Sequence, residues 1–592
     1  MKGRLTEING PLVRAQLPQA TNGEQVRIGK QGIIGEVIGR DGDYATIQVY
    51  EETETLKPGE EVIALGYPLS VELGPGLMGN IFDGIQRPLE TLAQSAGDYI
   101  PRGSSIAPLD HNKLWHFQPN PDISIGDHLL GGEVLGKVEE TESVMHHILV
   151  PPDTQGTLLK IQPQGDYCLD DDIAWIQSGQ DEQALNLFHR WPVRKPRPYK
   201  QRDHAIAPLI TGQRIFDTFF PLLKGGKAAV PGPFGAGKTI VQQQIARWSN
   251  ADIVIYVGCG ERGNELVEIL TSFPDIVDPK SKRSLMERTI LVANTSNMPV
   301  VAREASIYVG VTIAEYYRDQ GLDVVMVADS TSRWAEALRE VSGRLGQMPV
   351  EEGYPAYLAS RLSAFYERAG RVHTLSDQRG SVTLIGAVSP PGGDFSEPVT
   401  GHTKEIVETF WALSKELADA RHYPAVSWTE SFSGYVTIAA QWWIKQTDEE
   451  WQQLRTEALN LLARDAELMR IVNLVGPEAL SPEQRWILDG ANLIKEGILQ
   501  QSALDEVDSY ASPEKQYLLL KIMLLIYHRG IELLKLDMPV QELNKLSLLG
   551  KAKRCKSTYS SEQSSGLRDF IDNINQVFDG LKQTYSENSN KV

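Results

Sequence analysis

Short apolar runs separated by turn residues open the chain. Residues 44–50 alternate between apolar and polar side chains, and further apolar runs occur at 10–13, 32–38 and 61–64. Gly, Asp and Pro stand between these runs, as expected for strands joined by tight turns. We therefore expect a small β-barrel or sandwich over residues 1–70, with a structural task.

The next stretch, residues 71–190, is also rich in strands and turns. Strand candidates lie at 148–152 and 156–161. His146 and His147 are adjacent, which raises the question of a metal site. Neighbouring side chains of a strand point to opposite faces, so we favour a structural role for both.

A proline-rich stretch follows at residues 191–198. Its prolines exclude helix and strand interiors, so we expect an extended linker. It carries the basic residues Arg194, Lys195 and Arg197. We interpret them as part of a solvated hinge in preference to a binding patch.

Apolar runs alternate with helical patterns between residues 200 and 400. This alternation is typical of a mostly parallel sheet covered by helices. Helical spacing is clearest at 300–320 and 357–368. The strand candidates are the apolar runs at 228–230, 252–257, 289–293, 323–328 and 381–388.

Beyond about residue 435 the apolar positions recur at helical spacing, notably at 449–472, 486–499 and 516–536. We expect an α-helical C-terminal domain that ends in a frayed tail rich in Ser, Asn and Lys. The chain is thus predicted to be a multidomain α/β protein. Its predicted domains are 1–70, 71–190, 191–435 and 436–592.

A glycine-rich turn between a strand candidate and a helix candidate carries the strongest chemical signal. Residues 232–239 fit the phosphate-loop pattern G-x-x-x-x-G-K-[ST]. Glycines let backbone N–H groups close around a phosphate, and the helix N-terminus adds its dipole. We expect Lys238 to reach the terminal phosphates of a nucleotide and the Thr239 hydroxyl to bind Mg²⁺. The nucleotide-binding residues predicted here are Gly232, Pro233, Phe234, Gly235, Ala236, Gly237, Lys238 and Thr239.

Composition restricts the number of domains, the kind of partner and the cellular compartment of this nucleotide-binding protein. The 592 residues are too many for one core, so several domains are expected. A formal net charge of −19 argues against a surface for nucleic acid. The 3 cysteines cannot make a disulfide framework and fit a reducing compartment. The chain start has no apolar signal core and no apolar run is long enough to span a bilayer, so we expect a cytoplasmic protein that reaches a membrane through partners.

Two strand candidates lead into residues suited to act on a nucleotide. Ligands of open α/β sheets lie at the carboxyl ends of strands. The run at 252–257 leads to Glu261 and Arg262, a carboxylate that can polarise water and a guanidinium that can neutralise phosphate charge. The run at 323–328 leads to Asp329, the Walker B arrangement, in which a carboxylate holds Mg²⁺ through its water shell.

Six motifs together resemble one family. They lie at 232–239, 258–265, 293–300, 329–340, 352–357 and 389–394 and read GPFGAGKT, GCGERGNE, ANTSNMPV, DSTSRWAEALRE, EGYPAY and SPPGGD. The set closely resembles the catalytic A subunit of V-type rotary ATPases, called A-type in archaea and bacteria. The resemblance covers nearly the whole chain, and the strand-rich segment at about 110–190 looks like the insertion that is specific to this family.

The resemblance implies an alternating ring of three A and three B subunits that hydrolyses or synthesises ATP. A central shaft and a peripheral stalk would couple the ring to H⁺ or Na⁺ translocation in a membrane sector. Lys238 would bind the β and γ phosphates, Thr239 the Mg²⁺, and Asp329 would hold that metal through water. Glu261 would position the lytic water and Arg262 would assist at the γ-phosphate. An arginine finger from the neighbouring B subunit would complete the site, so the chain alone should hydrolyse ATP poorly.

The resemblance also implies an adenine pocket. Tyr423 lies where the family usually has a stacking aromatic, and Gln501 and Leu504 lie in the stretch that closes the pocket. Leu504 stands where an aromatic is common, so weaker stacking is expected. Ser427 stands at a position that is usually Asp or Asn, and Ala236 replaces the phosphate-loop cysteine of the eukaryotic members. A thiol switch in the phosphate loop is therefore not available.

Two other classes of protein share a phosphate-loop core. The first is a ring ATPase that moves another polymer, such as a termination helicase or a secretion-export ATPase. A helicase needs a basic channel or an aromatic stacking surface, which the acidic balance does not offer, and an export ATPase would lack the insertion at 110–190. The second is a non-catalytic structural subunit, which predicts a damaged phosphate loop or no carboxylate at position 261, and both features are intact.

Overall fold

The computed structural model describes residues 2–97, 100–104, 106–278 and 281–589. Contacts divide the chain into two compact units. The first unit comprises 1–205, 224–229 and 251–407, and the second comprises 206–223, 230–250 and 408–592. Each unit therefore combines segments that are distant in the sequence.

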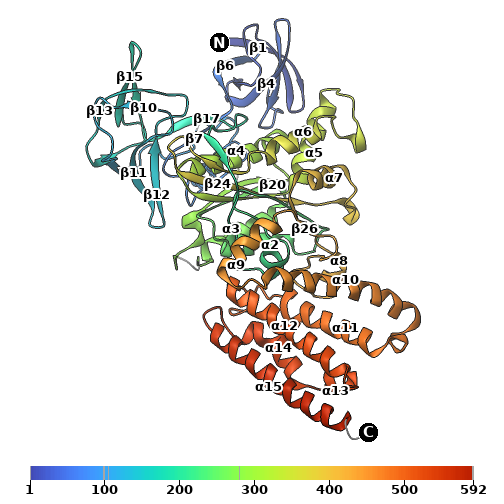
Figure 1. Ribbon diagram of the computed structural model, residues 1–592. Coiled ribbons are helices and arrows are strands. Elements are labelled where there is room, and N and C mark those ends of the chain that lie inside the picture. The colour runs from blue at the N-terminus through green and yellow to red at the C-terminus, as the bar shows by residue number, and fades with distance from the viewer. Residues whose placement is uncertain (1, 98–99, 105, 279–280, 590–592) are drawn as a thin grey trace. The chain divides into compact units, whose positions relative to one another are not determined.

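A closed barrel of antiparallel strands forms the start of the first unit, drawn in blue in Figure 1. Around the barrel the strands follow the order β1 (Lys2–Asn9), β2 (Leu12–Gln16), β5 (Tyr44–Val49), β4 (Ile33–Asp41), β3 (Glu24–Ile28), β6 (Glu61–Pro68). Val26, Ile28 and Ile47 belong to its buried apolar core. The predicted barrel is confirmed. Strands β1 and β3 were not predicted because charged side chains interrupt their short apolar pattern.

The next part of the first unit contains two four-stranded sheets with the orders β10-β13-β15-β16 and β12-β11-β9-β14. The strand pairs within these two sheets are antiparallel. The predicted strand-rich segment is thereby confirmed. The strands are β9 (Trp115–Pro119), β10 (His128–Leu129), β11 (Val134–Thr141), β12 (Val144–Leu149), β13 (Gly156–Ile161), β14 (Gly165–Tyr167), β15 (Ala174–Ser178) and β16 (Asp181–Leu185).

The adjacent histidines of β12 do point to different environments. His146 is fully buried, with Nδ1 2.6 Å from a Glu140 carboxylate oxygen and Nε2 2.7 Å from the Tyr316 hydroxyl. His147 is only half-buried. Neither residue belongs to a metal-ligating cluster among the described residues. His146 thus joins the strand to a helix of the same unit, as the structural interpretation expects.

The solvated hinge expected at 191–198 is wrong for Arg194 and Arg197, although Lys195 is exposed as that expectation requires. Arg194 binds Glu304 at 2.7 Å and Glu36 at 3.3 Å. Arg197 is 1% exposed and binds Asp319 at 2.6 Å. Carboxylates that lie far away in the sequence neutralise both guanidinium groups, which lets these two residues of a proline-rich segment pack against the unit. The segment continues β17 (His189–Pro192), which pairs with β7 (Ser70–Leu73).

A mostly parallel sheet forms the centre of the first unit. Its strands β24 (Arg379–Val388), β22 (Asp323–Asp329), β20 (Ile253–Glu261), β21 (Thr289–Thr295) and β8 (Ile81–Phe82) pair in parallel in that order. Beside β24 lie β23 (Gly370–His373), which pairs antiparallel with it and with β18 (Gln201–Asp203), and β19 (Lys227–Pro231), whose last two residues belong to the second unit. The predicted parallel sheet is confirmed, and its carboxyl edge carries Glu261 and Asp329.

Helices cover this sheet, and α4 is the most deeply buried of them. It packs on β20, β21, β22 and β24, and a Cβ at Gly310 would lie 2.4 Å from the Val257 side chain. A glycine is therefore required where the helix meets the sheet. The helices of this unit are α1 (Leu89–Ala96), α3 (Gly263–Asp275), α4 (Val300–Asp319), α5 (Thr331–Arg344), α6 (Leu358–Tyr366) and α7 (Pro398–Ile406).

The second unit is largely helical, and its C-terminal helices are drawn in orange and red in Figure 1. Helix α11 packs against α10 and α12, and Trp443 stacks on Trp451 with ring centroids 5.1 Å apart. This confirms the predicted helical domain. Its elements are α2 (Lys238–Trp248), β25 (Thr409–Phe410), α8 (Lys415–Asp419), β26 (Phe432–Ser433), α9 (Val436–Gln446), α10 (Trp451–Val475), α11 (Pro482–Ile494), α12 (Pro513–Leu534), α13 (Val540–Asn544), α14 (Ser547–Thr558) and α15 (Ser564–Ser589), with π-helical turns at Ile215–Phe219 and Lys495–Leu499.

Most of the last thirty residues are helical and not the frayed tail that their composition predicts, and residues 590–592, the very end of that predicted tail, lie outside the described residues. Residues Ser564–Ser589 form α15, which packs against α12. Leu567, Ile574 and Phe578 lie on one face of this helix and are buried. Their spacing of seven and four residues is helical, and the many polar residues between them conceal it.

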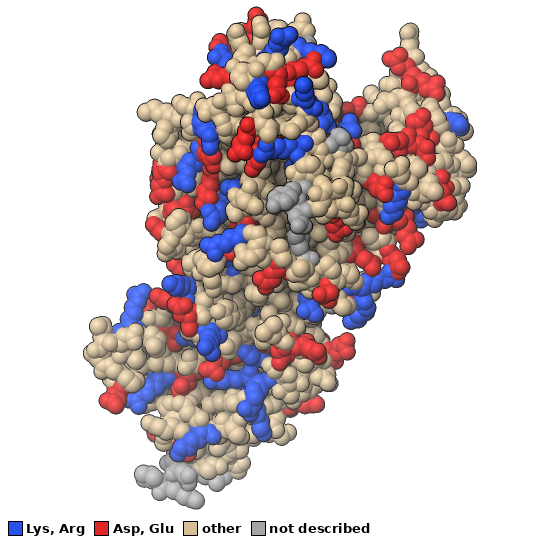
Figure 2. Space-filling view, turned by 180° about the vertical axis from the view of Figure 1, so that it is seen from behind, with Lys and Arg blue, Asp and Glu red and all other residues tan. Residues whose placement is uncertain are grey.

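The surface carries charges of both signs. On the face shown in Figure 2, basic and acidic side chains of the described residues are interspersed over most of the visible area. Of the helices in the described ranges, not one combines the length and the apolar character needed to cross a membrane.

Candidate active site

The phosphate-loop motif forms a tight turn in the second unit, between β19 and α2. Gly235 and Gly237 have φ angles of 81° and 86°, which favour glycine because a Cβ would be strained there. The Lys238 ammonium donates to the Gly232 carbonyl oxygen at 3.0 Å. A Cβ on Gly232 would lie 2.6 Å from Leu413 Cβ, so a glycine is also needed at the start of the loop. The loop thus has the backbone that a phosphate-binding turn requires.

The loop side chains differ in exposure. Ala236 is buried, whereas Phe234 is 73% exposed. Lys238 and Thr239 are half-buried in the first turn of α2, where the backbone N–H groups have no partner within the helix. An anion placed there would meet N–H donors, the helix dipole and the ammonium together.

A cleft of about 580 Å³ adjoins the loop within the second unit. The residues that line it include Ala236, Gly237 and Ile240 from the loop and α2, and also Tyr423, Pro424 and Leu504. A Cβ on Gly237 would lie 3.6 Å from the Tyr423 ring, which places this ring beside the loop. Tyr423 is 44% exposed, so part of its face is open for stacking.

Gln501 and Leu504, the other two residues predicted for the adenine pocket, differ in how far their side chains are exposed. Leu504 is 97% exposed and can contact a ligand without rearrangement. The side-chain amide of Gln501 is buried and fully used, because it accepts from the Arg214 N–H and donates to the Gly212 and Asp508 carbonyls. Its backbone N–H donates to the Tyr423 carbonyl at 2.8 Å. Gln501 therefore holds the wall of the cleft, and direct contact with a nucleotide stays a prediction.

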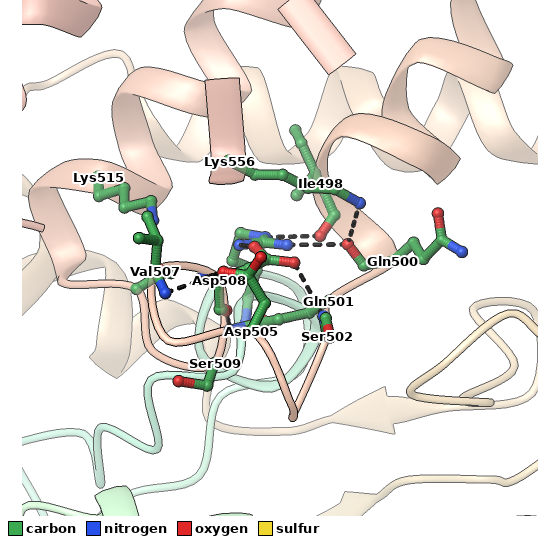
Figure 3. Close-up of polar contacts among 12 residues, drawn as sticks. Ile498, Gln500, Gln501, Ser502, Asp505, Val507, Asp508, Ser509, Lys515 and Lys556 are labelled. Atoms are coloured by element: carbon green, nitrogen blue, oxygen red, sulfur yellow. Dashed lines mark hydrogen bonds and ion pairs between the residues drawn. The ribbon is translucent and has the colours of Figure 1, made fainter. Parts of the chain in front are cut away.

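A network of charged groups, drawn in Figure 3, lies behind this wall. The Arg214 guanidinium donates to the Ile498 carbonyl at 2.8 Å, to the Gln500 carbonyl at 2.8 Å and to Asp508 at 2.6 Å. Both members of the Arg214–Asp508 pair are buried. Burial alone would raise the pKa of the Asp508 carboxyl, but Arg214 and the Ser502 N–H lower it. The carboxylate stays charged and fixes the segment from 500 to 508.

The two candidate carboxylates of the first unit stand at the carboxyl edge of adjacent parallel strands. Glu261 ends β20 and Asp329 ends β22, with Gly258 opposite Asp329 in the register. The pairing of β20 with β21 shifts register between Cys259 and Glu261, next to Gly260, which has a φ of 74°. This irregularity turns the end of β20 out of the regular ladder.

Asp329 is buried and its carboxylate accepts a hydrogen bond from the Tyr256 hydroxyl at 2.8 Å. Burial, and then the charge of Asp329, raises the pKa of Tyr256 far above its ordinary value, so the phenol keeps its proton. Tyr256 was not predicted as a site residue, because a tyrosine inside an apolar run is ordinary strand composition. Arg262 is exposed at the N-terminus of α3.

Two departures from the resembled family can also be placed. The Ser427 hydroxyl lies 3.1 Å from the Thr429 hydroxyl, and the Ser427 N–H donates to the Ala412 carbonyl at 2.7 Å. Position 236 is a buried alanine, so the phosphate loop carries no thiol at this position. Cys259 is buried in β20, and burial raises the pKa of its thiol to about 12. This thiol is unreactive at neutral pH.

Family models match most of the chain and define its class. Residues 212–433 match the nucleotide-binding domain of the ATP synthase alpha/beta family, and residues 5–66 match the beta-barrel domain of that family. Residues 106–194 match the barrel-sandwich domain of the same family. Residues 440–540 match the C-terminal domain of V and A type ATP synthases. The class is therefore that of ATP synthase chains with a phosphate loop.

Individual relatives show to which branch of the ATP synthase family the chain belongs. The V-type ATP synthase alpha chain of Nitrosococcus oceani is 69% identical over 586 residues, which cover 99% of both chains. The corresponding A-type ATP synthase chain of Methanopyrus kandleri is 53% identical over 98% of both chains. The V-type ATP synthase alpha chain of Halothermothrix orenii is 50% identical over 99% of this chain and 100% of its own. The chain belongs to the family of V-type ATP synthase alpha chains and their A-type counterparts.

A solved structure shares the fold at much lower sequence identity. The assembled ATPase EscN of the type III secretion system of enteropathogenic E. coli matches with a TM-score of 0.61 and 22% identity. The match covers 88% of this chain and 99% of that one. This likeness extends to the fold alone.

Proposed function

We propose that this chain is the catalytic subunit of a V/A-type ATP synthase, which hydrolyses or forms ATP coupled to H⁺ or Na⁺ translocation by a membrane sector. The observation that carries the proposal is 69% identity over 99% of a V-type ATP synthase alpha chain. The intact phosphate loop and the carboxylates of Glu261 and Asp329 also support it, because they are the groups that ATP binding and hydrolysis need.

The phosphate loop and the cleft bind the nucleotide. Lys238 neutralises the β and γ phosphates of ATP, and the loop N–H groups donate to their oxygens. Tyr423 stacks on the adenine, with Leu504 on the edge of the same cleft. The exposed Phe234 and the glycines of 232–237 line the phosphate chain.

The Thr239 hydroxyl and the Asp329 carboxylate are each oxygen groups of the kind that Mg²⁺ prefers. The described ranges contain no cluster of three or more His, Cys, Asp or Glu that could hold a metal by itself. Mg²⁺ bound with ATP suits such a site, because this ion keeps most of its water and takes one or two protein oxygens besides the phosphates. When bound, the ion neutralises charge that develops on the phosphates.

Hydrolysis then depends on the groups that act at the γ-phosphate. The Glu261 carboxylate accepts a hydrogen bond from the attacking water and aims its oxygen at the phosphorus. Arg262 stabilises the charge of the transferred phosphoryl group, together with an arginine finger donated by a neighbouring B-type subunit. The same groups serve synthesis in reverse.

The partners are those of a rotary complex. Three copies alternate with three B-type subunits around a central shaft, with a peripheral stalk and a membrane sector that the chain reaches only through other subunits. No nucleic acid is involved. The chain acts on the cytoplasmic side, and its parts are a barrel at 1–70, a strand-rich part at 71–190, an ATPase domain at 191–435 and a helical domain at 436–592.

The decisive experiment compares ATP hydrolysis by the chain alone and after assembly with its B-type partner. We expect little activity alone and activity on assembly, because the arginine finger comes from the partner. Lys238→Ala in the same assembly should weaken ATP affinity about a hundredfold, as expected for a lost ammonium at phosphate. Unchanged affinity for ATP in this variant would remove the phosphate-loop assignment, and equal activity with and without the partner would remove the shared site.

A further inference from the structure

One peptide group in the second unit connects the charged network to the stacking aromatic. The carbonyl of Gln500 and the N–H of Gln501 belong to the same planar peptide. That N–H donates to the Tyr423 carbonyl at 2.8 Å. The position of the Gln500 carbonyl therefore determines the orientation of the bond that supports Tyr423.

Two cations hold this carbonyl. The Arg214 guanidinium donates to it at 2.8 Å. The Lys556 ammonium donates to it at 2.7 Å (Figure 3). Lys556 also donates to the Glu496 carbonyl at 2.6 Å. Lys556 comes from α14 and lies on the wall of the cleft itself. Hydrogen bonds from a charged donor are stronger than neutral ones, and bonds in series polarise one another.

We propose that Lys556 is a positioning residue for nucleotide binding: it fixes the peptide between Gln500 and Gln501 and thereby holds Tyr423 and the 500–504 wall in place for the base. The proposal rests on the function proposed above, since it assumes that the cleft takes the adenine. It concerns recognition of the base and not of the phosphates, because the bonds of Lys556 lead to the wall.

The surroundings of Lys556 make this support dependent on pH. Burial, and then the charge of Arg214, lowers the pKa of Lys556 to about 8, although nearby carboxylates oppose the shift. Below that pH the ammonium makes its charge-assisted bonds, and above it the charge is lost. The charged and titratable groups that influence it are Arg214, Asp508, Asp505, Glu496 and, beside Tyr423, His422.

A second lysine of the network titrates in the same range. Burial lowers the pKa of Lys515 to about 8, and this ammonium donates to the Val507 carbonyl at 2.9 Å. Its titration remains when Lys556 is replaced. The contribution of Lys556 is therefore the part of the pH dependence that a substitution at 556 removes.

The first test measures the affinity of the full chain for Mg·ADP and for magnesium tripolyphosphate, which has no base. Lys556→Met keeps the aliphatic stem and removes the donor, so we expect the Kd for Mg·ADP to rise about tenfold. The Kd for tripolyphosphate should change by less than about twofold. Lys553→Met is the matched control, because Lys553 lies on the same helix and binds the Glu496 carboxylate at 3.0 Å without a bond to Gln500.

The second test is the pH profile of the Kd for Mg·ADP between pH 7 and 9.5. Affinity of the unmutated chain should fall through about pH 8, where Lys556 loses its charge. Lys556→Arg stays charged over this range, so it should bind normally at pH 7 and lose this part of the fall. Lys556→Met should bind weakly at both ends of the range.

Three outcomes would overturn the proposal: equal Mg·ADP affinity for Lys556→Met and the unmutated chain, equal losses for Mg·ADP and tripolyphosphate, or the same effect from Lys553→Met. A thermal unfolding scan separates loss of the fold from loss of positioning, because a Lys556→Met variant that keeps the Tm of the unmutated chain is folded and its Kd values then report on the wall. Failure of the unmutated chain to bind either Mg·ADP or tripolyphosphate would instead overturn the function proposed above.

Discussion

The phosphate loop and the base-side wall lie in the same unit but are built in opposite ways. The loop consists of the eight consecutive residues 232–239. The wall brings together Tyr423, the 500–508 segment, Arg214 and Lys556, which are separated by up to several hundred residues. The two meet where the Tyr423 ring lies beside Gly237.

The difference reflects what each part must bind. A phosphate takes N–H donors from any backbone of the right curvature, so a short run of glycines is enough. A base needs a flat apolar face held at a fixed place, and the holding groups can come from any segment that folds nearby. Substitutions in local motifs should therefore affect phosphate binding and chemistry, whereas substitutions in the network should affect base affinity and stability.

The largest effect should come from Glu261→Gln, which tests a local motif. In the assembled ring we expect the kcat for ATP hydrolysis to fall about a thousandfold, because the amide cannot act as a base towards water. Nucleotide affinity should remain, since the amide has the same size. Steady-state ATPase assays and equilibrium ADP binding measure the two quantities.

Glu268→Gln is the matched control, because Glu268 is exposed on α3 a few residues away. It should leave both quantities unchanged. If Glu261→Gln abolished binding together with turnover, Glu261 would be part of the binding surface and not the group that positions water.

The local motifs were predictable from the sequence because their chemistry and their spacing coincide. Gly235 and Gly237 have the positive φ angles that a phosphate turn demands. The runs before Glu261 and Asp329 are buried parallel strands, and such runs are read directly from apolar composition. The barrel and the helices of the C-terminal domain were predicted because their apolar positions recur at the spacing of strands or helices, except for α15, whose spacing polar residues conceal.

The network was not predictable, because its members are chemically ordinary in sequence. Arg214 and Lys556 belong to no motif, and their partners at 498–508 are mainly backbone carbonyls, which every residue has. The same reason explains the wrong interpretation of Arg197. The sequence around Arg197 predicts a solvated cation, because its partner Asp319 is more than a hundred residues away in the chain and only the fold brings the two together.

The stability of the base-side wall is tested by Asp508→Asn. The substitution leaves the buried Arg214 guanidinium without its carboxylate, and such a loss typically lowers the free energy of unfolding by about 3 kcal/mol. Urea unfolding followed by tryptophan fluorescence measures it. Glu506→Gln is the control, because Glu506 is exposed two residues away. Equal stability of both variants would show that the pair does not hold the wall.

A smaller effect should follow Tyr256→Phe, which removes one hydrogen bond to Asp329. We expect the Mg²⁺ concentration for half-maximal ATPase activity to rise about tenfold, because groups that orient a metal-holding carboxylate commonly contribute this much. Tyr50→Phe is the matched control, since the Tyr50 hydroxyl donates to Glu36 in the barrel. A shift in neither variant would show that Asp329 needs no support from Tyr256.

The smallest effect should come from Leu504→Phe, which changes the base-side wall without disturbing the network. Leu504 is 97% exposed, so an aromatic ring fits there without repacking. A second ring beside the base should add roughly 1 kcal/mol of stacking, which corresponds to about fivefold tighter Mg·ADP binding and no change for tripolyphosphate. Isothermal titration of both ligands measures the difference. An equal gain for both ligands would place the new ring against the phosphates, and the wall would then not be the side of the cleft that receives the base.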